Sequence, residues 1–129
     1  MQDLNWLLSS KKDLMTFPTE VRQEIGFALY VAQEGETHHS AKLFKGLGSG
    51  IYEIVVDYNK DTFRAVYVVN LNKNIFVNDS IYVLHVFQKK SKKGIKTPMK
   101  DLNIIKQRLK FLKAELTKGG MLCQTSKGS

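Results

Sequence analysis

The sequence predicts one α+β domain in which helices come first, a small antiparallel sheet follows and a last helix completes the fold. The chain has 129 residues, the length of a single domain, and 43% of them are hydrophobic. That is enough for a core without disulfides or a structural metal. Apolar residues recur at helical spacing near both ends, whereas β-branched and aromatic segments occupy the middle. We place the domain at residues 1–118 and a flexible tail at 119–129.

Two helices are expected in the first third of the chain. A short helix spans Asn5–Met15. A second begins around Pro18, which suits the first helical position because its missing N–H is not needed there. It runs to about Gln33 and stops at Gly35. Its residues at i, i+4, i+7, i+8 and i+11 form one apolar stripe: Val21, Ile25, Ala28, Leu29 and Ala32.

The middle of the chain predicts a loop and then three strands. Residues 34–50 are polar and glycine-rich, with a short ordered piece at 41–44. Tyr58-Asn59-Lys60-Asp61 is a hairpin turn between the first two strands. A further segment, Ile75-Phe76-Val77, extends a strand before the third begins. The three strands are Ile51–Asp57, Thr62–Val69 and Ser80–Gln88.

A final helix follows residue 96. Thr97 suits the N-cap and Pro98 the first turn. Gly119-Gly120 ends the helix. Its buried stripe is Leu102, Ile105, Leu109, Leu112 and Leu116, and its other faces carry Lys106, Arg108, Lys110 and Lys113.

Positive charge is concentrated near the C-terminus. The net charge is +8, yet residues 1–88 hold 8 Lys and Arg against 10 Asp and Glu, whereas residues 89–129 hold 12 against 2. Such asymmetry favours a polyanionic partner, most often nucleic acid. The single cysteine, Cys123, excludes an intrachain disulfide, and no apolar stretch is long enough to span a membrane. We therefore expect a cytoplasmic protein with no membrane partner.

The common catalytic and cofactor motifs are missing from the sequence, so we expect no cofactor and no metal. His38 and His39 are adjacent in a loop, and adjacent side chains rarely converge on one ion. The glycines at 46, 48 and 50 precede a strand, whereas a phosphate-binding loop follows one.

What remains is a set of cations on ordered elements. Arg64 lies mid-strand, where a charged side chain must face solvent, a partner charge or a ligand; an ion pair with Glu53 on the neighbouring strand would be a purely structural role. Lys89 and Lys90 follow Phe87 at the end of the third strand. Further basic or titratable candidates are Lys42, Lys45, Lys92, Lys93 and His85, and His85 has the commoner alternative of a half-buried core histidine.

Together these residues suit cleavage of an RNA phosphodiester. The reaction needs an activated 2′-hydroxyl, neutralisation of a phosphorane-like transition state and a protonated 5′-oxygen. Arginine and lysine supply the second need directly, and lysine or histidine can exchange the protons. An aromatic ring such as that of Phe87 can stack on a base.

Several motifs resemble the HigB-type, phage-derived branch of the RelE/ParE toxin superfamily of bacterial toxin–antitoxin systems. The most specific runs from Tyr82 to Pro98 and contains Phe87-x-Lys89-Lys90 followed by Thr97-Pro98. Supporting matches lie at 17–29, 41–46, 52–54 and 63–67, and the whole resemblance covers about residues 6–113. The link at Asn70–Ser80 is longer than usual for this branch.

The resemblance implies a RelE-like toxin fold with two N-terminal helices on a small antiparallel sheet. It implies a ribosome-dependent mRNA endonuclease that is neutralised by a HigA-like helix-turn-helix antitoxin. The toxin would contact operator DNA only through this antitoxin. The implied catalytic residues are Arg64, Lys89 and Lys90, to which the residue chemistry adds His85. The implied RNA-binding residues are Lys42, Lys45 and Phe87, and Lys92 and Lys93 would add docking charge toward ribosomal RNA. Two other functions stay open: a non-enzymatic gyrase poison, and a basic RNA-binding module without cleavage.

Overall fold

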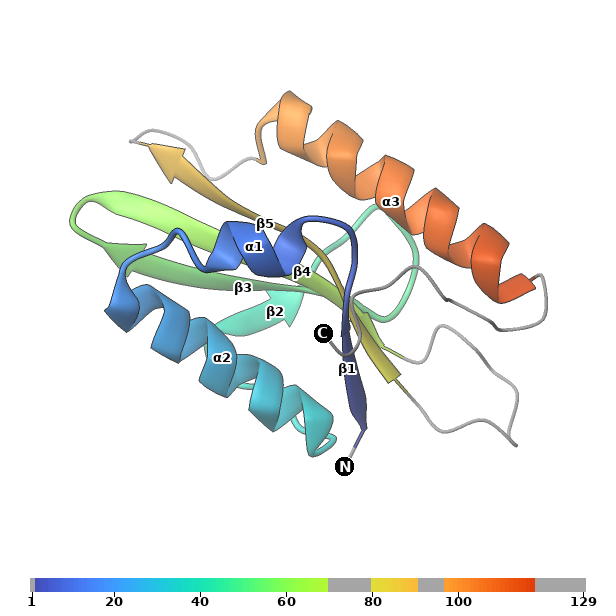
Figure 1. The fold of residues 1–129 in the computed structure, drawn as a ribbon, viewed down its shortest axis with the longest axis horizontal. Helices are drawn as coiled ribbons and strands as arrows, with labels where there is room; N and C mark the ends of the chain where they lie inside the picture. The colour runs from blue at the N-terminus through green and yellow to red at the C-terminus, as the bar shows by residue number, and fades with distance from the viewer. Residues whose placement is uncertain (1, 70–79, 91–96, 118–129) are drawn as a thin grey trace.

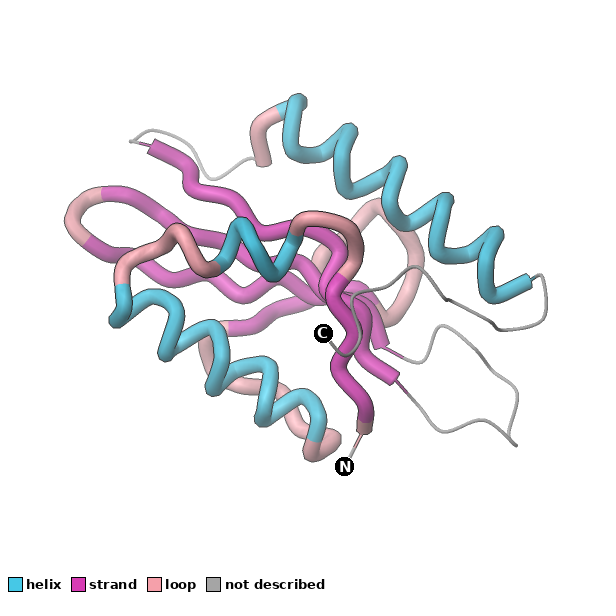
Figure 2. Tube along the Cα trace, viewed as in Figure 1, coloured by secondary structure: helices cyan, strands magenta, loops and turns pink. Residues whose placement is uncertain are grey.

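Five strands form one mixed sheet in the computed structural model, which describes residues 2–69, 80–90 and 97–117. The sheet order is β1-β5-β4-β3-β2, and only the β1–β5 pair is parallel. Helices α1 and α2 lie on one side of the strands and α3 on the other (Figures 1 and 2). The elements are β1 (Asp3–Trp6), α1 (Ser10–Leu14), α2 (Thr19–Gln33), β2 (Ala41–Leu43), β3 (Ile51–Tyr58), β4 (Asp61–Val69), β5 (Ser80–Lys90) and α3 (Met99–Thr117).

The N-terminus corrects the expected fold. The first helix was expected over Asn5–Met15, but Asn5 and Trp6 belong to strand β1, which is parallel to β5, and the helix is confined to Ser10–Leu14. The sheet is therefore mixed, not purely antiparallel. A four-residue strand carries too little alternation to be found in a sequence. The strand is defined by its pairing with β5, from Asp3↔Ser80 to Trp6↔Val83, and the Leu7 amide donates to the Val83 carbonyl at 3.1 Å. The Gln2 amide donates to the Gln33 carbonyl at 3.0 Å, which joins the start of the chain to the end of α2.

Helix α2 confirms the predicted stripe, because all five of its apolar residues are buried. Pro18 is its N-cap, with φ −57° and ψ 151°, so the helix begins one residue later than expected. Gly35 ends it with φ +89°. The amide of Gly35 donates to Ala32 and that of Glu36 to Val31, a Schellman motif that needs the left-handed conformation glycine adopts without strain.

The predicted hairpin is also confirmed. Strands β3 and β4 pair from Ile51↔Val68 to Tyr58↔Asp61. Asn59 and Lys60 have φ values of +51° and +70°, the left-handed pair that a two-residue type I′ turn requires.

Both faces of the sheet are buried. The α2 core combines α1, α2 and one strand face, and it includes Ile25, Leu29, Ile54, Ala65 and Tyr67. The α3 core lies on the other face, where Ile105, Leu109 and Leu112 of the predicted stripe pack against the strands. Leu102 of that stripe is half-buried, and the side chain of Leu116 lies outside the described part.

Strand β5 contains a β-bulge at Leu84. The register pairs Val66 with His85 but Tyr67 with Val83, so Leu84 is the extra residue. Strict alternation would place His85 with Val83 on the α2 side. The bulge instead turns His85 and Phe87 toward α3, because one extra residue reverses the facing of everything beyond it.

Some expectations fall on segments that the structure does not describe. These are the strand extension at 75–77, the docking lysines Lys92 and Lys93, and the tail at 119–129. Among the described residues, no helix is both long and apolar enough to cross a membrane.

The junction between Gly50 and Val69 gives a stability prediction. Gly50 has φ +78°, and a Cβ there would lie 2.7 Å from the Val69 carbonyl oxygen. We expect Gly50→Ala to lower the free energy of unfolding by about 1–3 kcal/mol, measured by chemical denaturation. The control is Gly26→Ala on the exposed side of α2, where an added Cβ would meet no described atom within 4 Å outside its own helix backbone and chain neighbours. This change should raise stability by about 0.5–1 kcal/mol, so equal effects of the two substitutions would contradict the account.

Candidate active site beneath helix α3

Four sheet residues and one helix residue define the α3-facing site: Glu53 on β3, Arg64 on β4, His85 and Phe87 on β5, and Asp101 on α3. Register places them on one face. Val66 lies opposite both Glu53 and His85, and Arg64 lies opposite Phe87. Residues paired across strands point the same way, so these side chains neighbour one another.

Arg64 is held by a buried ion pair. Its Nη1 donates to Glu53 Oε2 at 2.9 Å, and each side chain is only 7% exposed. Burying a guanidinium costs a large free energy unless an opposite charge lies beside it, and Glu53 supplies that charge. Arg64 Nε is buried without a hydrogen-bond partner in the described residues. The ion pair with Glu53, expected as the purely structural alternative for Arg64, is therefore present. The Nε donor of Arg64 is still without a partner in the described residues.

His85 forms the second pair of the site. Its Nε2 lies 2.8 Å from Asp101 Oδ1, and its Nδ1 is buried without a partner among the described residues. Burial lowers the pKa of His85 below 6.5, and this outweighs the opposing effect of the Asp101 hydrogen bond. A neutral His85 that donates from Nε2 to the carboxylate keeps a lone pair on Nδ1, the arrangement of a general base.

Phe87 is buried in the free protein. Its ring stacks on the His85 ring with centroids 5.1 Å apart and an interplanar angle of 16°, and the residue is 6% exposed. A nucleotide base could reach this ring only if α3 or the His85 side chain moved.

The candidate lysines differ in how close they lie to the site and in how exposed they are. Lys42, opposite Glu53, and Lys89, opposite Thr62, are on the α3-facing side of the sheet by register. Lys42 is exposed and Lys89 half-buried. Lys45 is exposed in the loop after β2. Lys90 pairs with Asp61 through the strand register, and its side chain lies outside the described part.

Arg108 is a residue whose role the sequence did not predict. It was expected on a polar face of the last helix, but its Nη1 donates to the Leu84 carbonyl at 2.8 Å and its Nη2 to Ser9 Oγ at 3.2 Å. Ser9 in turn donates to Asp13 at 2.9 Å. Arg108 thus fastens α3 to the bulge of β5. The sequence signal for this role was its spacing, because a residue three positions after the buried Ile105 lies on nearly the same face of the helix.

Asp101 was also missed, although it is the acidic residue in the first turn of α3. A carboxylate is favoured there by the helix dipole, so its presence alone would not point to a site.

A second cluster brings Glu24, His38 and His39 together, with ligand atoms within 4.8 Å of one another. The two histidines thus converge more than expected. The Ser40 amide donates to His38 Nδ1 at 3.0 Å, which puts the proton of a neutral ring on Nε2. Metal-bound histidine instead donates from its second nitrogen. The cluster as it stands does not offer His38 as a ligand.

The described architecture is that of a small mixed α+β protein, compatible with a toxin fold. A family model described as phage-derived protein Gp49-like (DUF891) matches residues 12–110. The chain therefore belongs to the Gp49-like family, a RelE-like toxin family of toxin–antitoxin systems. Searches of curated proteins and of solved structures gave no match.

The lowered pKa of His85 predicts a pH dependence of stability. The unfolded chain takes up a proton on this residue near pH 6.5, whereas the folded protein does so only at lower pH. Stability should therefore fall as pH drops below 6.5 toward the folded pKa. We expect His85→Asn to flatten the unfolding free energy between about pH 7 and 5. His39→Asn, at an exposed position, should keep the slope. An unchanged slope in His85→Asn would refute the assignment.

The anchoring of α3 predicts a second effect. Arg108→Met removes the donor to the buried Leu84 carbonyl, so we expect a loss of about 1–3 kcal/mol in unfolding free energy. Lys110→Met, at an exposed position of the same helix, should change stability by less than about 0.5 kcal/mol. Denaturant titration of both variants checks this. Similar stability of the two would show that Arg108 does not anchor the helix.

Proposed function

We propose that this protein is a HigB-like toxin that cleaves ribosome-bound mRNA and is neutralised by a cognate helix-turn-helix antitoxin. Membership of a RelE-like toxin family supports the toxin class. The observation that carries the RNA-cleaving assignment is Arg64, a guanidinium on the second of the two antiparallel hairpin strands, whose buried Nε has no hydrogen-bond partner among the described residues. Arginine presents five donors in a rigid fork that matches phosphate oxygens.

The chemistry divides among the residues of the α3-facing site. His85 Nδ1 takes the proton of the ribose 2′-hydroxyl, whose oxygen attacks the adjacent phosphorus. Arg64 donates to the phosphoryl oxygens as charge builds on them. A lysine of the Lys89–Lys90 pair protonates the leaving 5′-oxygen. The 2′-oxygen–phosphorus bond forms and the phosphorus–5′-oxygen bond breaks, so the upstream fragment ends in a 2′,3′-cyclic phosphate.

The closed state of the site supports dependence on the ribosome. Arg64, His85 and Phe87 are each 6% exposed, and both titratable groups have carboxylate partners. A substrate phosphate must therefore compete with Glu53 for Arg64 and displace part of the cover provided by α3. Binding energy from a large RNA surface can drive such an opening, whereas a short free RNA offers little.

Loss of the Arg64 cation should abolish toxicity. Arg64→Ala alone leaves Glu53 buried and unpaired, so it can fail by unfolding. The sharper variant is Arg64→Gln combined with Glu53→Gln, which removes both charges and keeps a neutral hydrogen bond. We expect growth arrest on induction by the wild type and about 10²–10³-fold less mRNA cleavage by the double variant. The control is Lys11→Ala on α1, which is exposed and should stay toxic. A folded double variant as toxic as the wild type would disprove the role of Arg64.

The same induction separates the other functions. A gyrase poison stops DNA replication before translation, and a non-cleaving RNA-binding protein produces no new mRNA 5′ ends. We expect translation to stop first and new 5′ ends to appear within coding regions.

A further inference from the structure

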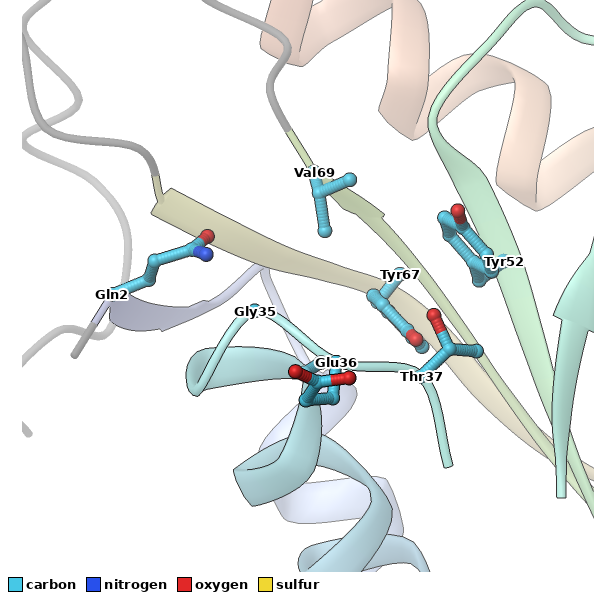
Figure 3. Close-up of a pocket in the computed structure, with 8 residues that line it drawn as sticks. Gln2, Gly35, Glu36, Thr37, Tyr52, Tyr67 and Val69 are labelled. Carbon is cyan, nitrogen blue, oxygen red and sulfur yellow. The ribbon is translucent and has the colours of Figure 1, made fainter. Parts of the chain in front are cut away.

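A pocket of about 140 Å³ lies on the opposite face of the sheet from the α3-facing site. One water molecule occupies about 30 Å³ in the liquid, so the pocket holds a group of several heavy atoms. It is formed where the end of α2 meets the N-terminal residues and strands β3 and β4 (Figure 3). Its lining includes Gln2, Glu36, Tyr52 and Tyr67.

The C-terminal end of α2 gives this pocket a negative potential. Ala32, in the last turn of the 15-residue helix, and Gly35, one residue after its C-cap, are part of the pocket lining. A helix C-terminus carries about half a negative charge, which favours cations. Glu36 adds a full carboxylate at the rim. This is local negative charge in a protein whose net charge is +8.

Gln2 contributes a buried acceptor that lacks a donor. Its Oε1 is buried with no hydrogen-bond partner in the described residues. The backbone of Gln2 is fixed, because its amide donates to the Gln33 carbonyl and its carbonyl accepts from Gln33 Nε2 at 2.9 Å. The side-chain amide is the end turned toward Val69 and Tyr67 (Figure 3). A buried acceptor without a donor costs about 1–3 kcal/mol, so a donor bound in the pocket would be favoured.

Two aromatic rings complete the lining. Tyr52 and Tyr67 stack with centroids 5.5 Å apart and 13° between their planes. Burial raises the pKa of Tyr67 to about 12, so its hydroxyl stays protonated at neutral pH. The face of a neutral phenol ring attracts cations within about 6 Å.

We propose that this pocket binds a guanidinium group. Its carboxylate, helix C-terminus, unpaired amide oxygen and aromatic rings all favour a cation with several donors, and they disfavour an anion. Guanidinium fits better than ammonium because it is planar, stacks on aromatic rings and is more weakly hydrated. The arginine side chain of a protein partner and a free guanidino compound share this chemistry. The inference does not depend on RNA cleavage.

The test is an NMR titration of the full chain that follows the Gln2 side-chain amide and the Tyr52 and Tyr67 ring signals. The probe is N-acetylarginine methylamide, and its neutral isostere is N-acetylcitrulline methylamide. We expect the arginine probe to shift these signals and the citrulline probe to bind at least about fivefold more weakly. Equal binding of the two probes, or shifts confined to other residues, would overturn the proposal.

Matched variants make the result specific to the pocket. Glu36→Gln should weaken binding of the arginine probe about fivefold, since it removes a partly exposed charge. Glu34→Gln changes a neighbouring carboxylate that does not line the pocket and should leave binding unchanged. If Glu36→Gln bound as tightly as the wild type, the site would be disproved. Both variants are at exposed positions, so neither should unfold the protein.

A third probe, free arginine, distinguishes the sources. Capped arginine that binds as well as free arginine identifies a side chain of a protein partner. Free arginine that binds at least tenfold more tightly identifies a free guanidino compound. Either result supports a guanidinium site, provided that the citrulline probe binds weakly.

Discussion

The bulge at Leu84 decides which side chains meet beneath α3. Because it adds one residue to β5, it turns His85 and Phe87 from the α2 core toward the α3 core, beside Arg64. The Leu84 carbonyl accepts from Arg108, so the irregular strand and the covering helix are held by the same hydrogen bond. Without the bulge, His85 could not reach Asp101, and the candidate active site would not exist on this face.

Both buried nitrogen groups of the site have a carboxylate partner. Glu53 on β3 counters the charge of Arg64, which would be strongly destabilising if it were buried alone. Asp101 on α3 lies beside the neutral His85 and accepts a hydrogen bond from its Nε2. In the proposed RNA cleavage, a substrate phosphate would compete with Glu53 for Arg64. The opposite face of the sheet has the reverse character: the pocket at the end of α2 contains a carboxylate, a helix C-terminus and the Gln2 side-chain oxygen, which has no partner in the described part of the chain.

Much of the fold could be predicted because it follows from local patterns. The stripe of α2, the Gly35 stop, the hairpin turn at Asn59-Lys60 and the last helix are set by periodicity and turn chemistry. Strand β1 could not be predicted because its pairing partner is some 77 residues away, as in Asp3↔Ser80. The bulge was missed for a similar reason, since Leu84 looks like any apolar residue in an alternating strand. Predicting the roles of Asp101 and Arg108 required knowing which face of α3 meets β5.

The most direct test is cleavage of an mRNA that carries a single 2′-deoxynucleotide. Ribosomes are programmed with an all-ribose mRNA, cleavage by the full chain is mapped, and the deoxynucleotide is then placed on the 5′ side of the main cut. If the 2′-hydroxyl is the nucleophile, the ribose mRNA is cut with a 2′,3′-cyclic phosphate end and the substituted mRNA resists cleavage at this one position. Equal cleavage of both, or no cleavage by folded protein, would contradict RNA cleavage through the 2′-hydroxyl.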